Sequence, residues 1–185
     1  LKEKHIPLII DEVQTGAYRT GEFTASQVYG IEPEIITLAK GVGGGVPVGI
    51  VMTTLKHVLS AGDHGSTFGG NYLSATAVCE VVDILNELKE NGALENTSKY
   101  FNTKLETFFD ANQDVFTQKV GIGMMCGLRT VDSDTLAKII NNSRENGVML
   151  LRAGRNTLRF LPPLTISKIE IDEGFKRLRN ALKTL

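Results

Sequence analysis

A lysine stands where a buried strand is expected to end. The apolar run from Ile35 to Ala39 is typical of a buried strand, and Lys40 follows it directly, ahead of Gly41 and of the glycines at 43–45. Glycines allow a ligand to approach the backbone closely. An ammonium group at the mouth of a packed sheet is poorly solvated, so the neutral amine becomes accessible and can form a Schiff base with a carbonyl. The alternative is that Lys40 only extends into solvent as the strand ends.

A carboxylate follows an earlier apolar run. The segment from Ile6 to Ile10 is almost continuously apolar, as in a parallel strand buried on both faces, and it ends at Asp11 and Glu12. Asp11 precedes Lys40 by 29 positions, which fits a strand, crossover and strand unit with parallel strands that are adjacent or nearly so. A short helix from Ala25 to Tyr29 is expected in the crossover. We therefore expect Asp11 and Lys40 to project from the same edge of one sheet, where ligands collect in open α/β folds.

Hydroxyl groups and glycines precede a long helical pattern. The segment from His64 to Asn71 contains Ser66 and Thr67, and apolar residues at three-to-four spacing then predict a helix from about Asn71 to Glu90. Free amides and the positive end of the helix dipole make such a helix start an anion site. The alternative is an ordinary helix cap and turn.

The remaining pattern predicts two domains with a boundary near residue 92. Residues 1–91 carry the glycine-rich sheet, with a further strand from Val46 to Thr53 and a short helix from Leu55 to Leu59. Residues 92–185 are expected to form a small α+β domain. Its predicted elements are a helix over Thr97 to Phe116, a strand over Val120 to Arg129, a helix capped by Asp132 or Ser133 and closed by Gly147, strands over Val148 to Leu151 and Thr157 to Leu161, and a last helix with a capping box of Ser167 and Glu170.

Composition narrows the classes of function. The chain has 185 residues with 42% hydrophobic content, enough for a real core, and a formal net charge of -1 gives no basic field for nucleic acid or a membrane surface. No run is long and apolar enough to span a bilayer. Cys79 and Cys126 lack metal or redox spacing, which favours reduced thiols in a cytoplasmic protein and no metal site. The chain begins with Leu1 rather than Met, so we expect a fragment of a longer protein.

These residues match the needs of pyridoxal 5'-phosphate. That cofactor needs a lysine for its carbonyl and a carboxylate for its protonated ring nitrogen, and Lys40 and Asp11 are of those types. Arg159 offers a planar fork suited to a substrate carboxylate. The further candidates are Val13 against the ring face, Gln14 at the phenolic oxygen, and Ser66 and Thr67 at the phosphate.

Four motifs resemble those of the class III pyridoxal-phosphate-dependent aminotransferases. They are Asp11-Glu12-Val13-Gln14-Thr15-Gly16, Leu38-Ala39-Lys40-Gly41 with Gly43-Gly44-Gly45, Gly65-Ser66-Thr67-Phe68-Gly69-Gly70-Asn71, and Leu158-Arg159-Phe160-Leu161-Pro162-Pro163-Leu164. The resemblance covers nearly the whole chain. It implies the type I pyridoxal-phosphate transferase fold, an α/β fold, with 1–91 as the C-terminal part of the large cofactor-binding domain and its long connecting helix, and 92–185 as the small C-terminal domain.

The resemblance also implies an activity. Lys40 and Asp11 are the catalytic residues, and the terminal amino group of N-acetylornithine passes to 2-oxoglutarate in arginine biosynthesis. Thr67, with Ser66, reaches the cofactor of a neighbouring subunit, so a homodimer with shared active sites is expected.

Three alternatives stay open. In the first, ornithine or another omega-amino acid is the amino donor. In the second, the chain is a catalytically inert module for folding or dimerisation. A P-loop-like nucleotide site at Gly41 to Gly45 is disfavoured, because Lys40 precedes the glycines and no Gly-Lys-Ser/Thr sequence is present.

Overall fold

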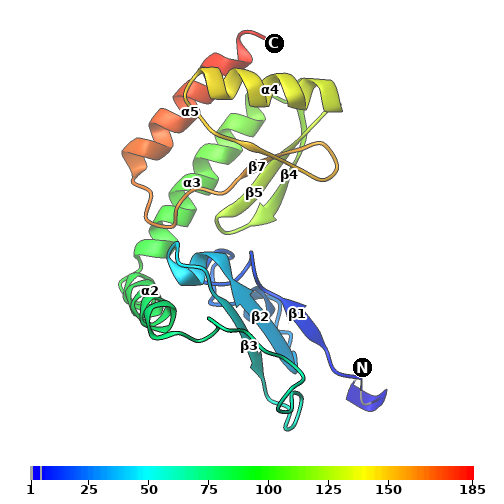
Figure 1. Ribbon diagram of the computed structural model, residues 1–185. Coiled ribbons are helices and arrows are strands. Elements are labelled where there is room, and N and C mark those ends of the chain that lie inside the picture. Colours follow the sequence, from blue (N-terminus) through cyan, green and yellow to red (C-terminus); the bar gives the residue numbers. More distant parts are fainter. Residues whose placement is uncertain (1, 5) are drawn as a thin grey trace. The chain divides into compact units, whose positions relative to one another are not determined.

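The chain forms two compact units in the computed structural model, which describes residues 2–4 and 6–185. The first unit is Leu1–Gly92 and the second is Ala93–Leu185 (Figure 1). Each unit has its own sheet.

A three-stranded sheet forms the first unit, with the order β1-β2-β3. Strand β1 (Ile9–Asp11) is parallel to β2 (Ile35–Ala39), and β2 is antiparallel to β3 (Gly49–Thr53). The two strands are therefore parallel neighbours, as the spacing of Asp11 and Lys40 predicted. The register pairs Asp11 with Thr37, three residues before Lys40, so β1 and β2 end at the same edge of the sheet.

Two strands of this unit begin later in the chain than the sequence predicted. Strand β1 begins at Ile9 rather than Ile6, and β3 begins at Gly49 rather than Val46. Each lost segment contains a proline, Pro7 or Pro47, and proline has no N–H to give to a ladder. A short 3-10 helix, η1 (Lys2–Lys4), precedes β1.

Two short helical turns connect the strands. Helix α1 (Ala25–Val28) lies in the crossover, close to its expected bounds, and begins at a capping box formed by Thr24 and Gln27. A 3-10 helix, η2 (Lys40–Gly43), follows β2 directly. Lys40 thus begins η2 at the point where β2 has ended.

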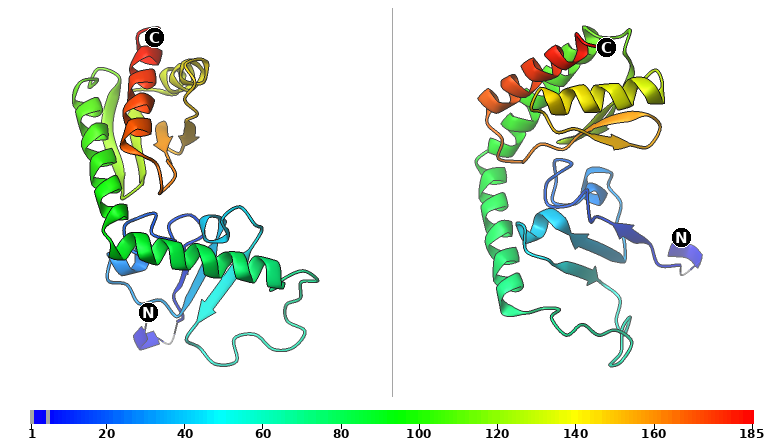
Figure 2. Two further views of the ribbon diagram at one scale, coloured as in Figure 1. Left: turned by 90° about the vertical axis from the view of Figure 1, so that its left-hand side faces the viewer. Right: turned by 45° about the horizontal axis from the view of Figure 1, so that its top comes forward.

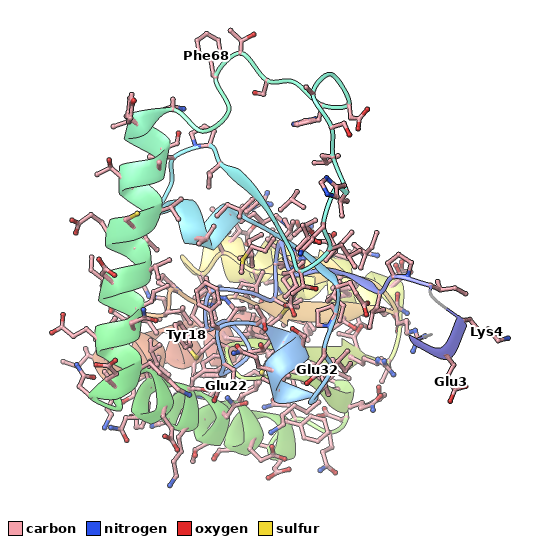
Figure 3. All side chains as sticks on the ribbon, turned by 90° about the horizontal axis from the view of Figure 1, so that it is seen from below. Glu3, Lys4, Tyr18, Glu22, Glu32 and Phe68 are labelled. Carbon is pink, nitrogen blue, oxygen red and sulfur yellow. The ribbon has the colours of Figure 1, made fainter. Side chains whose placement is uncertain are left out.

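Residues 54–70 form turns and bends rather than the short helix expected over Leu55–Leu59, so that prediction was wrong. All of these residues are exposed, and no apolar side chain among them is buried to stabilise a helix turn. Phe68 lies on this loop and points away from the rest of the unit (Figure 3).

The long helix expected from the apolar spacing is confirmed as α2 (Tyr72–Glu90). Its N-cap is Asn71, whose side chain accepts a hydrogen bond of 3.0 Å from the Ser74 amide. Helix α2 runs beside η2 (Figure 2), and a Cβ added at Gly44 would meet Val81 of α2 at 2.7 Å. Gly44 has a φ of 60°, so its conformation and its close contact with α2 both favour glycine.

Loop 13–24 is tied to the C-terminal half of α2. Tyr18 donates a 2.7 Å hydrogen bond to Asn86, and the Lys89 ammonium binds the Gly21 carbonyl and the Glu22 carboxylate at 2.9 and 2.8 Å. Figure 3 shows Tyr18 and Glu22 on the side of the unit where α2 ends. These contacts hold the crossover against the helix.

The second unit is a four-stranded antiparallel sheet with three helices. Its order is β4-β5-β7-β6, and every neighbouring pair is antiparallel. The strands are β4 (Phe116–Ile122), β5 (Met125–Thr130), β6 (Leu151–Ala153) and β7 (Thr157–Phe160), and the helices are α3 (Ala93–Asp110), α4 (Ser133–Glu145) and α5 (Lys168–Leu182). The capping box of Ser167 and Glu170 is present at the start of α5 as expected.

Several bounds expected in this unit were wrong, among them the strand expected over Val148 to Leu151, which is β6 at Leu151–Ala153, and the start of α3, which is Ala93 rather than Thr97. Helix α3 ends at Asp110 rather than Phe116, and Phe116 begins β4. The single strand expected over Val120 to Arg129 is a hairpin of β4 and β5 instead. The chain reverses at Gly123 and Met124, where Gly123 has a φ of 60°, and Gly121 just before it in β4 has a φ of 94°. Neither glycine adds a polar residue that would mark a turn in the sequence.

One core joins the three helices to one face of this sheet. The aromatic stripe of α3 is part of the core, as expected, and Phe101 and Phe108 contact Phe175 of α5 at ring-centroid distances of 5.9 and 5.6 Å. Leu158 and Phe160 of β7 belong to the same core. Among the helices of the described residues, none is long and apolar enough to cross a membrane.

Candidate functional site

Asp11 is the last residue of β1, and its carboxylate is held by two donors. Oδ1 accepts hydrogen bonds from the Val13 amide at 2.9 Å and from Thr37 Oγ1 at 3.2 Å. The side chain is exposed, and Oδ2 makes no hydrogen bond within the described residues. The carboxylate is therefore oriented through one oxygen and has the other available for a ligand.

Lys40 follows β2 with a strained backbone. Its φ is 52°, in the left-handed region that residues with a Cβ rarely adopt, and it comes directly after the extended residue Ala39. Such strain is of the order of 1 kcal/mol and gathers at functional sites. The side chain is exposed, and within the described residues its ammonium forms no ion pair.

The sheet brings Asp11 and Lys40 to one edge. Their strands are parallel neighbours, and Thr37 lies opposite Asp11 while its hydroxyl orients the Asp11 carboxylate. Sequence reasoning missed the part played by Thr37. The parallel pairing expected for the two strands was the signal that could have found it.

The turn after β1 presents Val13 and Gln14 next to Asp11. Both side chains are half-buried. Between Asp11 and Val13, Glu12 turns the other way and is 1% exposed. Its carboxylate accepts hydrogen bonds from Thr15 Oγ1, from the Ala25 amide at 3.0 Å and from the Ser26 amide at 2.7 Å.

The pKa of Glu12 lies below its ordinary value of 4.5. Burial raises that pKa, but the hydrogen bonds from Thr15, Ser26 and Ala25 to the carboxylate lower it by more. Glu12 is thus a buried carboxylate that stays ionised at neutral pH. Sequence reasoning missed it too, because its partners at α1 lie 13 and 14 residues away.

Ser66 and Thr67 precede α2 in the sequence and come from neither β1 nor β2. They belong to the exposed loop before α2, and Ser66 lines a groove formed with residues 46–51 and the first turns of α2. Gly69 is required beside Ser66, because an added Cβ would meet the Ser66 side chain at 2.8 Å. Among the described residues, neither hydroxyl forms a hydrogen bond with Asp11 or Lys40.

Arg159 lies in β7 of the second unit, opposite Gly127 of β5. The neighbouring Leu158 and Phe160 point into the core, so alternation along the strand directs Arg159 to the other face of the sheet. Its Nε is buried and has no hydrogen-bond partner within the described residues. A guanidinium that lacks an internal carboxylate partner is suited to an external anion.

The donor set of the first unit fits pyridoxal phosphate. The free Oδ2 of Asp11 is an acceptor for a protonated ring nitrogen, and the Lys40 ammonium, with no carboxylate partner among the described residues, is a possible covalent anchor at the same edge. Val13 and Gln14 lie in the adjoining turn. These are the residue types that hold this cofactor in transferases with a Schiff-base lysine.

Fold and donor set together define a pyridoxal-phosphate-dependent transferase of the type I fold. Comparison with solved structures agrees. Ornithine delta-aminotransferase of Plasmodium falciparum superposes with a TM-score of 0.87 at 31% identity, over 99% of this chain and 48% of that one. N-acetylornithine aminotransferase of Stenotrophomonas maltophilia gives a TM-score of 0.82 at 29% identity, over 99% of this chain and 48% of that one.

The chain belongs to the class-III aminotransferase family, whose model matches residues 1–182. Among curated relatives, acetylornithine aminotransferase of Wolinella succinogenes is 50% identical over 99% of this chain and 47% of its own length. Acetylornithine aminotransferase of Methanocaldococcus jannaschii is 41% identical over 92% of this chain and 42% of its own length. The chain spans about half the length of the curated relatives that it matches. The cofactor of the family, pyridoxal phosphate, and an enzymatic role as a transferase are thereby supported.

Proposed function

We propose that the protein transfers the terminal amino group of N-acetylornithine to 2-oxoglutarate in arginine biosynthesis. The observation that carries the proposal is the placement of Asp11 and Lys40 at one edge of two adjacent parallel strands. The amino donor is inferred from the relatives named acetylornithine aminotransferase. Because the chain matches about half of their length, the activity is proposed for the protein expressed from its complete reading frame.

Lys40 and Asp11 hold the proposed catalytic positions. Lys40 Nζ would anchor pyridoxal phosphate covalently, and after substrate has replaced it Nζ would move the proton at the carbon that bears the amino group. Asp11 Oδ2 would accept the hydrogen bond of the ring nitrogen, while Thr37 and the Val13 amide keep the carboxylate oriented through Oδ1. When bound, pyridoxal phosphate supplies the carbonyl and an electron sink for the transferred amine.

The remaining candidates surround the cofactor in the proposal. Val13 packs on the ring face and Gln14 donates to the phenolic oxygen. Ser66 and Thr67 bind the phosphate held by a second copy of the chain, which makes the protein a homodimer with shared active sites. Both residues are exposed, which leaves them accessible to another copy. The first unit then serves as part of the large cofactor-binding domain and the second as the small C-terminal domain.

Arg159 is the proposed ligand of substrate carboxylates. Both N-acetylornithine and 2-oxoglutarate carry a carboxylate, so a single guanidinium can serve both half-reactions in turn. The unpartnered Nε of Arg159 supports this role. The proposed place of the reaction is the cytoplasm, which the two free cysteines, Cys79 and Cys126, support.

Borohydride reduction followed by mass spectrometry tests the anchor. We expect a cofactor adduct on the peptide that contains Lys40, glutamate formation from N-acetylornithine and 2-oxoglutarate, and loss of both in Lys40→Ala. Asp11→Asn should keep the adduct and lose most of the turnover. An unmodified Lys40 together with absent turnover would favour the inert module, and turnover in Lys40→Ala would refute the catalytic assignment.

Ornithine is the second candidate donor. Solved ornithine aminotransferases resemble the chain as closely in fold as the acetylornithine enzymes do, with a TM-score of 0.87 for the Plasmodium falciparum protein. A direct comparison of kcat/KM for N-acetylornithine and ornithine decides between the two donors. The proposal predicts a clear preference for the acylated donor, and a preference for ornithine would replace it.

A further inference from the structure

Glu12 is a buried carboxylate that the proposed transamination does not use. It stands between Asp11 and Val13, yet alternation along the chain turns it into the body of the first unit, where it is 1% exposed. An ionised carboxylate is costly to bury unless it is fully hydrogen-bonded. Its position inside the turn that carries Asp11 and Gln14 therefore requires a physical explanation.

The contacts of Glu12 fix the turn at both ends. Its amide donates to the Thr37 carbonyl of β2 at 2.9 Å, and its own carbonyl accepts from the Gly16 amide at 2.9 Å. Its carboxylate reaches forward to Thr15 and to the first amides of α1, Ala25 and Ser26. The peptide is thus attached to β2, to the end of its own turn and to the crossover helix.

These attachments determine where Asp11 and Gln14 can point. The Asp11 carboxylate is one residue before Glu12, and Gln14 is two residues after it within the same closed turn. An apolar side chain in place of Glu12 would leave the Ala25 and Ser26 amides without their acceptor, and the helix would lose its attachment to the turn. Because the Glu12 carboxylate binds both the turn and the start of α1, it controls the position of the turn relative to the crossover.

We propose that Glu12 is a positioning residue that holds Asp11 at the ring nitrogen and Gln14 at the phenolic oxygen of the cofactor. The inference rests on the proposed function, in which these two side chains touch the ring. Glu12 itself touches neither cofactor nor substrate. It acts through the geometry of the turn, so its loss alters the electronic state of the bound cofactor before it alters substrate binding.

The test compares Glu12→Gln with a matched change at the same helix start. The Glu12→Gln substitution would keep the shape of the side chain. It would replace one acceptor oxygen with an N–H₂ group, which would face backbone N–H donors that now bind a carboxylate oxygen. Gln27→Ala is the control, since Gln27 is exposed, accepts from Thr24 at the start of α1, and makes no hydrogen bond with Glu12 among the described residues. Both are measured in the protein expressed from its complete reading frame and loaded with pyridoxal phosphate.

A positioning role and a purely stabilising role of Glu12 predict different values of kcat and of cofactor absorption. Glu12→Gln should lower kcat by about tenfold with KM changed by less than about twofold. It should also shift the visible absorption of the bound cofactor in the same direction as Asp11→Asn. Gln27→Ala should lower the thermal midpoint while kcat and the absorption stay at wild-type values.

A second variant keeps the inference falsifiable if Glu12→Gln does not fold. Thr15→Val removes one of the donors to Glu12 at nearly constant shape, and a smaller change of the same kind is expected. Wild-type kcat and absorption in either variant would overturn the positioning role, whatever the thermal midpoint. If wild-type protein itself has no Lys40-dependent turnover, the proposed function fails; if it has that turnover and the Glu12 variants keep it, only the positioning role fails.

Discussion

Gly16 closes the turn that carries Asp11, and replacing it with alanine tests how rigid that turn is. A Cβ at this position would lie 2.5 Å from Leu38 Cδ2 and 2.8 Å from the Glu12 carbonyl oxygen. Ordinary contacts between carbon atoms are about 3.5–4.0 Å, so the methyl group overlaps a neighbour by roughly 1 Å. Gly16 does not need a positive φ, so the cost of Gly16→Ala is steric.

Neither neighbour has room to move. Leu38 is a central residue of β2 and is 3% exposed, and the Glu12 carbonyl is held by its hydrogen bond from the Gly16 amide. Overpacking of this kind costs about 1–3 kcal/mol. With a urea dependence of about 1–2 kcal/mol per molar, a loss of about 2 kcal/mol lowers the midpoint of the first unit by roughly 1–2 M.

Urea unfolding followed by circular dichroism measures that loss, and hydrogen exchange of separate peptides assigns it to the first unit. Gly49→Ala is the matched control in the same unit, because an added Cβ at Gly49 meets nothing within 4 Å. We expect peptides of the second unit to exchange as in the wild type. A Gly16→Ala protein as stable as Gly49→Ala would refute the claim that the turn is closely packed.

Three further outcomes are expected. Burial raises the pKa of Cys126 to about 11, so its thiol should resist alkylation at pH 8 in folded protein and react once urea unfolds it; rapid reaction without urea would contradict its burial. Arg159→Met removes a buried N–H without a partner, so the second unit should keep or gain up to about 1 kcal/mol of stability while KM rises for both carboxylate substrates. The pKa of Glu12 is lower in the folded state than its ordinary 4.5, so the stability it contributes is complete above pH 4.5 and declines as the pH falls through the folded pKa. The advantage of wild type over Glu12→Gln in urea unfolding should therefore shrink between pH 6 and pH 3, and an advantage that grows would be evidence against this assignment.

Local and periodic signals in the sequence were sufficient for much of the fold. The spacing of Asp11 and Lys40 predicted two parallel strands ending at one edge, and apolar spacing predicted α2 to within one residue at its start. The pair of Ser167 and Glu170 predicted the start of α5. Each of these features depends on neighbours along the chain or on the length of one crossover.

Features that depend on distant partners were not predictable in the same way. The hairpin of β4 and β5 was hidden because the chain reverses at Gly123 and Met124, inside an apolar segment with no polar turn residue. The burial of Glu12 depends on amides 13 and 14 residues away, and a sequence pattern gives a buried carboxylate the same appearance as an exposed one. The Thr37 hydroxyl became part of the site only once the register of β1 and β2 was known.

The backbone of Lys40 has a consequence for how this position evolves. In its left-handed conformation a residue with a Cβ is less stable than glycine by about 1–2 kcal/mol, and glycine returns only about 0.5–1 kcal/mol of that through its greater freedom in the unfolded chain. Folding alone therefore selects for glycine at position 40, while the amine selects for lysine. In a related chain that must still fold but no longer carries out the chemistry, selection for stability would favour glycine over lysine at this position.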